Sequence, residues 1–180
     1  MTFKVIGIAG PAQCGKDTAA DFIIEHRPAY KKASFADPIK AMLKAGFQMT
    51  DEQLYGANKE TADVRFGHSP RHMMQTLGTE WGRELIGGDV WVHAMEARLQ
   101  NQGGTFIIPD IRFNNEACFV RKYGSLIHIR GREDNIEETD HVSELGVTAM
   151  AGDRLINNDE DLSTYLCYVH KILTDIEGKW

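Results

Sequence analysis

The sequence predicts an α/β domain, with helices flanking a mostly parallel β-sheet. Short apolar runs alternate along the chain with longer segments of helical periodicity, which is the pattern of repeated strand–helix units. Several of these runs are almost continuously apolar, as is typical of strands covered on both faces. The chain of 180 residues is long enough to bury one hydrophobic core, so we expect a single domain over residues 1–180.

The strands and the first helices follow from the hydrophobic pattern. The expected strands are residues 4–9, 31–35, 105–109, 126–130 and 154–156. A helix is expected directly after the first strand, over residues 17–26. The polar stretch 47–70 shows only weak periodicity, so we expect short helices and loops there.

Two later helices have clear apolar faces. Between residues 70 and 86 an apolar side chain recurs at every fourth position, which predicts a helix with one buried stripe. That stripe would consist of Met73, Leu77, Trp81 and Leu85. The last helix, about 160–176, is expected only to cover the sheet. Its buried side would be formed by Leu162, Leu166, Val169, Leu173 and Ile176.

Composition excludes several classes of protein. With 42% hydrophobic and 26% charged residues, the chain is neither disordered nor fibrous. Its apolar runs are far shorter than the roughly 20 residues of a membrane span, and strand-like sequence starts directly after the N-terminus. We therefore expect a cytoplasmic protein without a membrane partner. A net charge of -6 argues against binding a nucleic acid polymer through a broad basic face, and the three scattered cysteines argue against a disulfide or zinc framework.

The strongest motif lies after the first predicted strand, where residues 10–16 match G-x-x-x-x-G-K. Glycines let backbone N–H groups converge on an anion, the following helix adds its positive end, and Lys16 can reach the terminal phosphates of a nucleotide. A chance match is the alternative, but the position between a predicted strand and a predicted helix argues against it. The residues predicted to hold the nucleotide here are Gly10, Gln13, Cys14, Gly15, Lys16, Asp17 and Thr18.

Asp17 departs from the usual motif, in which Ser or Thr follows the lysine. A carboxylate can take the same Mg²⁺ position as a charged oxygen ligand, or act through a metal-bound water. Alternatively, Asp17 only caps the following helix. We predict Asp17 as a catalytic or metal-binding residue, with capping as the alternative.

A second polar group follows the predicted strand 105–109. Asp110 falls at the carboxyl end of this strand, where open α/β sheets bind ligands, and could hold Mg²⁺ through water. Arg112 lies two residues further on and could clamp a phosphate with its planar guanidinium. The alternative is that Asp110 only caps the next helix and Arg112 is a surface residue. The sequence does not decide whether Asp17 or Asp110 organises the metal.

Several further blocks of sequence resemble those of a known protein family. They are GKDTAADFI (15–23), SFADPIK (34–40), RHMMQTLGTEWGR (71–83), DVWV (89–92), DIRFNNE (110–116), HVSE (141–144) and NNDEDL (157–162). In this order they resemble the deoxynucleoside monophosphate kinases of bacteriophages, over residues 4–166. The resemblance implies a three-layer P-loop kinase fold with a five-stranded parallel sheet in the order 2-3-1-4-5. It also implies an acceptor-binding insertion at about 37–100 and a lid at about 130–146.

The resemblance also implies roles for individual residues. The acceptor nucleotide would be bound by Lys40, Arg65, Gln75, Arg83, Trp91 and Arg112. Arg130 and Arg132 would act from the lid during catalysis, and Asn158 would lie near the adenine of ATP. For most of these residues a purely structural role is the alternative to substrate binding. The residue would then be a solvated charge, a packed aromatic side chain, or part of a turn that caps the last helix. No role follows for His141 and Ser143.

The predicted reaction is ATP-dependent, Mg²⁺-assisted phosphorylation of a deoxynucleoside monophosphate (dNMP) to the diphosphate. If the protein is encoded by a bacteriophage, it would act in the host cytoplasm. One alternative keeps the donor site but phosphorylates another small phosphorylated metabolite, because the Gly-Lys-Asp loop is also similar to that of phosphomevalonate kinases. The other is a nucleotide-binding module without turnover. The sequence leaves open the accepted bases, the selection of deoxyribose over ribose, and a homodimer.

Overall fold

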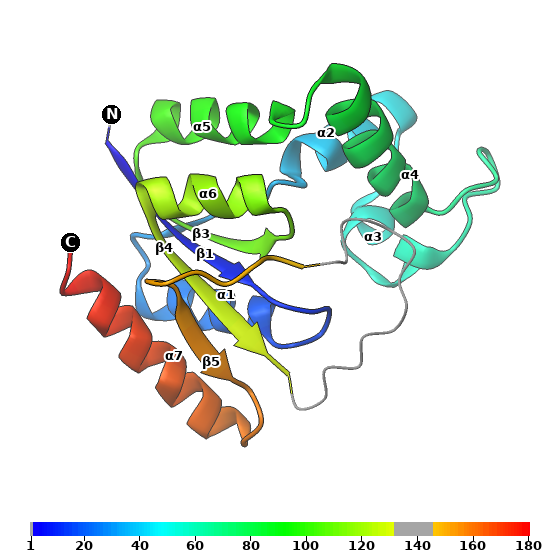
Figure 1. Cartoon of the computed structure of the whole chain (residues 1–180). Helices are drawn as coiled ribbons and strands as arrows, with labels where there is room; N and C mark the ends of the chain where they lie inside the picture. The colour runs from blue at the N-terminus through cyan, green and yellow to red at the C-terminus, as the bar shows by residue number, and fades with distance from the viewer. Residues whose placement is uncertain (1, 132–145) are drawn as a thin grey trace. The chain divides into compact units, whose positions relative to one another are not determined.

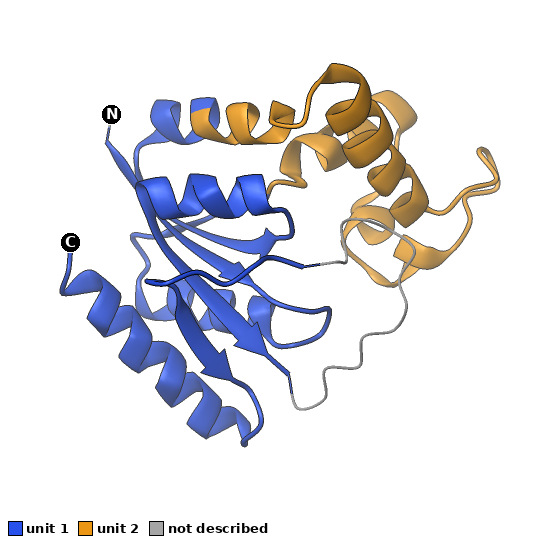
Figure 2. Ribbon diagram, viewed as in Figure 1, with its two compact units in different colours: residues 1–34, 97–180 blue, residues 35–96 orange. Residues whose placement is uncertain are grey.

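The computed structural model describes residues 2–131 and 146–180 (Figure 1). They form two compact units (Figure 2). Unit 1 comprises the described parts of Met1–Ser34 and Ala97–Trp180, and unit 2 comprises Phe35–Glu96. Unit 2 therefore overlaps most of the segment 37–100 for which an acceptor-binding role is predicted, and that role stays a prediction.

Unit 1 is built on a five-stranded sheet in the order β2-β3-β1-β4-β5, in which every neighbouring pair is parallel (Figure 1). The strands are β1 (Phe3–Ala9), β2 (Lys31–Lys32), β3 (Gly104–Ile111), β4 (Gly124–Arg130) and β5 (Arg154–Asn157). The predicted fold class and strand order are confirmed. β2 is shorter than the expected 31–35 because it is an edge strand that only β3 holds in the sheet.

Helices cover both faces of this sheet. On one face, Ile6 and Ile8 of β1 belong to a buried cluster with side chains of α1 (Lys16–His26) and α7 (Leu162–Glu177). On the other face lies α6 (Asn114–Tyr123), and a Cβ atom on Gly7 would be 2.8 Å from Val120 of this helix. Because side chains alternate along a strand, β1 is buried from both sides, as its apolar sequence predicts.

The strand order changes side at β1: the chain first places β2 and β3 on one side of this strand, and then β4 and β5 on the other. In open parallel sheets the crevice at such a switch point, beyond the carboxyl ends of the strands, is the usual ligand site. Three segments start at this edge: the loop after β1, the segment from Asp110 at the end of β3, and residues 130–131 at the end of β4. The topology thus gathers the predicted phosphate-binding motif and Asp110 on one edge of unit 1.

Unit 2 is helical. It contains α2 (Asp37–Phe47), α3 (Asp51–Leu54), the 3₁₀-helix η1 (Ala57–Glu60), α4 (Pro70–Thr76), the π-helix η2 (Leu77–Ile86) and the first part of α5 (Val90–Gln102). Thr50 caps α3, since its hydroxyl accepts a hydrogen bond from the Gln53 N–H while the Gln53 side chain accepts one from the Thr50 N–H. The expectation of short helices and loops over residues 47–70 is confirmed.

The predicted buried stripe on residues 70–86 is wrong. Trp81 and Leu85 are 40% and 77% exposed, whereas Gly78, Thr79 and Gly82 are buried. The reason is that η2 is a π-helix, whose wider turn no longer places every fourth residue on one face. The two glycines lie under other side chains instead: a Cβ atom on Gly82 would be 2.6 Å from the ring of Trp91.

The last helix also differs from its prediction. Val169, Leu173 and Ile176 are buried as expected, but the buried face begins at Tyr165, and Leu162 is 61% exposed. Tyr165 reaches the loop after β1, so α7 does more than cover the sheet. Neither α7 nor any other helix within residues 2–131 and 146–180 is long and apolar enough to cross a membrane.

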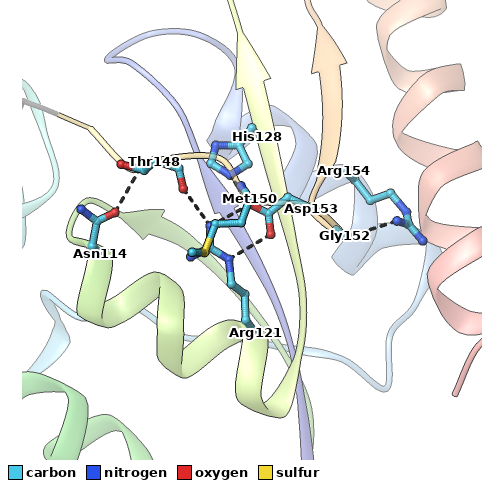
Figure 3. Close-up of polar contacts among 8 residues, drawn as sticks. All are labelled: Asn114, Arg121, His128, Thr148, Met150, Gly152, Asp153 and Arg154. Carbon is cyan, nitrogen blue, oxygen red and sulfur yellow. Dashed lines mark hydrogen bonds and ion pairs between the residues drawn. The ribbon is translucent and has the colours of Figure 1, made fainter.

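A buried polar network joins β4, α6 and the chain that leads into β5 (Figure 3). The Arg121 guanidinium donates two hydrogen bonds to the Asp153 carboxylate, of 3.0 and 2.7 Å, and a third to the Thr148 carbonyl. The same carboxylate accepts the Met150 N–H and lies 2.9 Å from Nε2 of His128. The network therefore fixes residues 148–153 against the sheet.

Burial raises the pKa of the Asp153 carboxyl group, but the hydrogen bonds from Arg121, the Met150 N–H and His128 outweigh it and bring this pKa to about 2, from an ordinary value of 3.8. A carboxylate with a depressed pKa stabilises the fold above its ordinary pKa, and this stabilisation is lost as the pH falls towards the folded-state value. Asp153→Asn should therefore lower the free energy of unfolding by about 2 kcal/mol at pH 7 and by roughly half of that at pH 3.

Urea unfolding of both proteins at pH 7, 5 and 3 measures this difference. The exposed Asp159, changed to Asn, provides the control and should have little effect at any of these pH values. A loss that is the same size at pH 7 and pH 3 would contradict the role of the ionised carboxylate.

Candidate functional site

The loop after β1 has the backbone geometry of an anion cradle. Gly10 and Gly15 have φ angles of 151° and 101°, and Gln13 has a φ of 60°. Gly10 also has no room for a side chain, because a Cβ atom there would lie 2.3 Å from the Ile129 carbonyl oxygen. The loop ends at the N-terminus of α1, where unpaired N–H groups and the helix dipole favour an anion. The sequence motif therefore has the local structure that phosphate binding requires.

Lys16 turns back over this loop. Its ammonium group donates hydrogen bonds to the carbonyls of Gly10, at 2.8 Å, and Pro11, and lies 3.8 Å from the sulfur of Cys14. Burial lowers the pKa of Lys16, and the nearby positive charge of Arg112 lowers it further. Burial raises the pKa of the Cys14 thiol, which keeps it neutral, so that no thiolate competes with a phosphate for the cation.

Asp17 does not cap α1. The N-cap residue is Gly15, without a side-chain cap, and Asp17 lies in the first turn with 82% of its side chain exposed. A cap through a side-chain hydrogen bond of Asp17 is therefore wrong, whereas its charge in the first turn still favours the positive end of the helix. Lys32 at the end of β2 lies 3.2 Å from Asp17 and 2.8 Å from Asp21. Asp17 thus presents an accessible oxygen beside the phosphate loop.

Asp110 and Arg112 lie on the same edge of the sheet. Asp110 is half-buried at the end of β3 and accepts a hydrogen bond of 2.5 Å from the Ser34 hydroxyl. Arg112 follows with an exposed side chain, and its backbone N–H donates to the carboxylate of Glu116 at 2.9 Å. Glu116 is 2% exposed and also accepts the Phe113 N–H, so it fixes the turn that carries Arg112. Ser34 and Glu116 lie within the blocks that resemble the family, at 34–40 and 110–116, but no role was predicted for either residue.

A pocket of about 350 Å³ opens beside the loop. It is lined by Gln13, Cys14, Gly131, Asn158, Glu160 and Leu162. The predicted nucleotide-binding residues Gln13, Cys14 and Asn158 therefore meet in one place, joined by three residues that sequence reasoning missed. The side-chain amide of Asn158 donates a hydrogen bond of 3.0 Å to the Cys14 carbonyl, so Asn158 contacts the loop itself.

The other predicted residues of unit 1 are only partly described. Arg130 is exposed at the end of β4, and its carbonyl accepts the Asn158 N–H at 2.8 Å. Arg132, His141 and Ser143 lie outside the described residues, as does nearly all of the predicted lid. Their roles stay predictions.

The predicted acceptor residues of unit 2 have contacts inside that unit. The ammonium group of Lys40 lies 4.0 Å from the ring centre of Tyr55. Arg65 makes a two-fold hydrogen-bonded ion pair with the buried Asp63, and the hydrogen bonds from Arg65 hold the pKa of that carboxyl group well below its usual range. Arg83 donates to the Gly78 carbonyl at 2.8 Å.

The remaining two unit 2 residues differ in exposure. Gln75 is half-buried on α4. Trp91 is 5% exposed, and its indole N–H donates to the Gly78 carbonyl at 2.7 Å. Packing inside unit 2 therefore accounts for Trp91, as the structural alternative to its predicted role expects. Its contact with a base stays a prediction.

The polar groups at this edge of unit 1 are those of a phosphate-binding site with carboxylates beside it, rather than those of a metal site closed by protein ligands alone. Among residues 2–131 and 146–180, no three His, Cys, Asp or Glu side chains gather closely enough to hold a metal ion by themselves. The loop N–H groups, Lys16 and Arg112 can bind phosphate oxygens, and the carboxylates of Asp17 and Asp110 lie at the same edge. Such a set positions phosphates and neutralises their charge.

Comparison with known proteins agrees with this chemistry. The family model described as "Deoxynucleotide monophosphate kinase" matches residues 4–66 and 59–168. The "Putative deoxynucleotide monophosphate kinase" of Acanthamoeba polyphaga mimivirus is 33% identical over 156 residues, which are 78% of this chain and 80% of that protein. The "Deoxynucleoside-5'-monophosphate kinase" of Escherichia phage T5 is 30% identical over 109 residues, 56% of this chain and 44% of that protein.

Among solved structures, a gluconokinase from Sinorhizobium meliloti 1021 superposes with a TM-score of 0.50 over 97% of this chain and 94% of that chain. At 11% identity this likeness shows a shared fold alone. The sequence matches show the family as well as the fold, since the family model covers most of the chain. The chain belongs to the deoxynucleotide monophosphate kinase family, and the family and enzyme class predicted from its sequence blocks are confirmed.

Proposed function

We propose that this protein transfers the γ-phosphoryl group of ATP to the 5′-phosphate of a deoxynucleoside monophosphate. The bond between the γ-phosphorus and the β–γ bridging oxygen breaks, and a bond to an oxygen of the acceptor phosphate forms, giving ADP and a deoxynucleoside diphosphate. The observation that carries this proposal is the phosphate loop of a family member, with Lys16 folded over it and Arg112 close enough to shift the pKa of Lys16.

The donor half of the proposal concerns unit 1 alone. The N–H groups of the loop would bind the β- and γ-phosphates, while Lys16 would exchange the carbonyls of Gly10 and Pro11 for phosphate oxygens. The pocket bordered by Asn158 and Leu162 adjoins the loop and has the size and mixed polarity for the nucleoside part of ATP.

The carboxylates of unit 1 fit a magnesium ion. Mg²⁺ keeps several waters and takes one or two protein carboxylates together with substrate phosphates, so it needs an open, oxygen-rich site. Asp17 is largely exposed, and Asp110 is half-buried and held by Ser34, which meets this description. When bound with ATP, Mg²⁺ would neutralise charge on the phosphates that react. We assign Asp110 as the more rigid and Asp17 as the more accessible of the two candidate ligands.

The acceptor half rests on cationic and polar side chains. We assign Arg112 to the transferring phosphoryl group, because its guanidinium carries a planar pair of donors and its positive charge contributes to lowering the pKa of Lys16. In unit 2 we favour Lys40, Gln75 and Arg83 as contacts of the acceptor nucleotide. Arg65 is already paired with Asp63, and Trp91 is packed inside the unit, so they are weaker candidates.

The test is release of ADP from ATP and Mg²⁺ with each acceptor in turn. The acceptors are dAMP, dCMP, dGMP and dTMP, the corresponding ribonucleotides, and phosphomevalonate. We expect stimulation by one or more dNMPs, and the same stimulation in the control variant Lys171→Ala, which removes an exposed lysine of α7. Turnover with phosphomevalonate alone would overturn the nucleotide acceptor. ATP binding without turnover on any acceptor would favour a nucleotide-binding module.

A further inference from the structure

A phosphate loop must satisfy its carbonyl groups as well as present its N–H groups. When the N–H groups converge on an anion, the carbonyls of the same peptides point away from it and need donors of their own. Two side chains supply such donors here, and the Gly15 carbonyl also accepts the Ala19 N–H of α1 at 3.0 Å. Nδ2 of Asn158 donates to the Cys14 carbonyl at 3.0 Å, and the Tyr165 hydroxyl donates to the Gly15 carbonyl at 2.9 Å.

These two bonds fix the orientation of two peptide planes. A trans peptide is planar, so its N–H points opposite to its C=O. The Cys14 carbonyl shares a peptide with the N–H of Gly15, and the Gly15 carbonyl shares one with the N–H of Lys16. Asn158 therefore sets the direction of the Gly15 N–H. Tyr165 sets that of the Lys16 N–H together with the Ala19 N–H, at the N-terminus of α1.

Both side chains are held in place by the fold. Tyr165 is 1% exposed within the core that α7 and the sheet share, and its burial raises the pKa of the phenol, so it remains a neutral donor. The backbone N–H of Asn158 bonds to the Arg130 carbonyl at the end of β4. The two side chains also occupy the space beside Gly15, where a Cβ atom would lie 2.8 Å from the Asn158 amide nitrogen and 3.2 Å from the Tyr165 hydroxyl.

We propose that Asn158 and Tyr165 are positioning residues, which act from behind the loop to aim the Gly15 and Lys16 N–H groups at the phosphates of the donor. This inference rests on the proposed function. It assigns to Asn158 a role other than contact with adenine, and to Tyr165 a role in a helix that the sequence predicts only as cover for the sheet.

The test uses Tyr165→Phe and Asn158→Leu, which remove the donor groups and keep most of each side chain's volume. Binding of inorganic tripolyphosphate and of ATP is measured by calorimetry on the full chain, followed by KM for ATP and for the accepted dNMP. We expect each variant to bind tripolyphosphate about tenfold more weakly, because a misdirected N–H loses its charged partner. KM for the acceptor should stay unchanged.

Matched controls separate positioning from general stability. Tyr168→Phe alters an exposed tyrosine of the same helix, and Asn157→Leu alters the exposed neighbour of Asn158; both should bind tripolyphosphate like the natural chain. A folded Tyr165→Phe protein with a lower thermal midpoint but unchanged tripolyphosphate affinity would overturn the inference. A natural chain that binds tripolyphosphate but phosphorylates no dNMP would refute the proposed function, while the comparison of variants would still decide this inference.

Discussion

Replacing Lys16 with alanine is expected to lower kcat by about three orders of magnitude, equivalent to about 4 kcal/mol of transition-state stabilisation. The reason is that Lys16 is the cation that lies over the phosphate loop, within 2.8 Å of the Gly10 carbonyl and half-buried, where its charge is poorly screened by water. The variant should also bind ATP more weakly, because the loop N–H groups alone must then hold the phosphates.

Acceptor-dependent ADP release and calorimetric ATP binding measure these two effects. Lys171→Ala serves as the control, since it removes the same charge from an exposed position on α7. Circular dichroism checks that the Lys16→Ala protein is folded. A folded variant that retains a tenth or more of the natural kcat would show that Lys16 does not stabilise the reacting phosphates.

Replacing Arg112 with alanine is expected to reduce kcat by about two orders of magnitude, about 3 kcal/mol, while the affinity for ATP changes by no more than about threefold. Arg112 is exposed, lies close enough to lower the pKa of Lys16, and is carried on a turn that Glu116 holds rigidly. These observations support the proposed contact of Arg112 with the transferring phosphoryl group, rather than a role in anchoring ATP. Arg112→Lys should recover only part of the rate, because lysine keeps the charge but not the planar pair of donors.

The measurements are kcat with a saturating dNMP and equilibrium binding of ATP to the same preparations. Arg154→Ala is the charge-matched control, because Arg154 lies at the start of β5 and is paired with Asp175. If Arg112→Ala loses ATP affinity as strongly as kcat, Arg112 belongs to the donor site. If kcat is unchanged, the assignment to the transferring phosphoryl group is wrong.

Some of the site was predictable because it depends on local sequence. Gly10, Gly15 and Lys16 occupy fixed places in a strand–loop–helix unit, and the backbone angles at both glycines show why no other residue suits them. Asp110 was predictable because it ends an apolar run, and the carboxyl ends of parallel strands share one edge. The partner of Arg65 was not predictable in this way. Its guanidinium forms an ion pair with Asp63, two residues away, and the sequence does not show which arginines are paired inside the fold.

The sequence by itself determined the α/β fold and the phosphate loop, since alternating patterns and short motifs are local properties of the chain. The resemblance of its sequence blocks to a known family also implied the order of the strands, which the structure confirms. Only the tertiary structure decided what lies behind and beside that loop. The hydrogen bonds of Tyr165 and Asn158 join residues about 150 positions apart, and the exposure of Trp81 follows from a π-helix that an average helical period does not predict. Such contacts depend on how elements distant in the sequence meet, and periodicity carries no information on that.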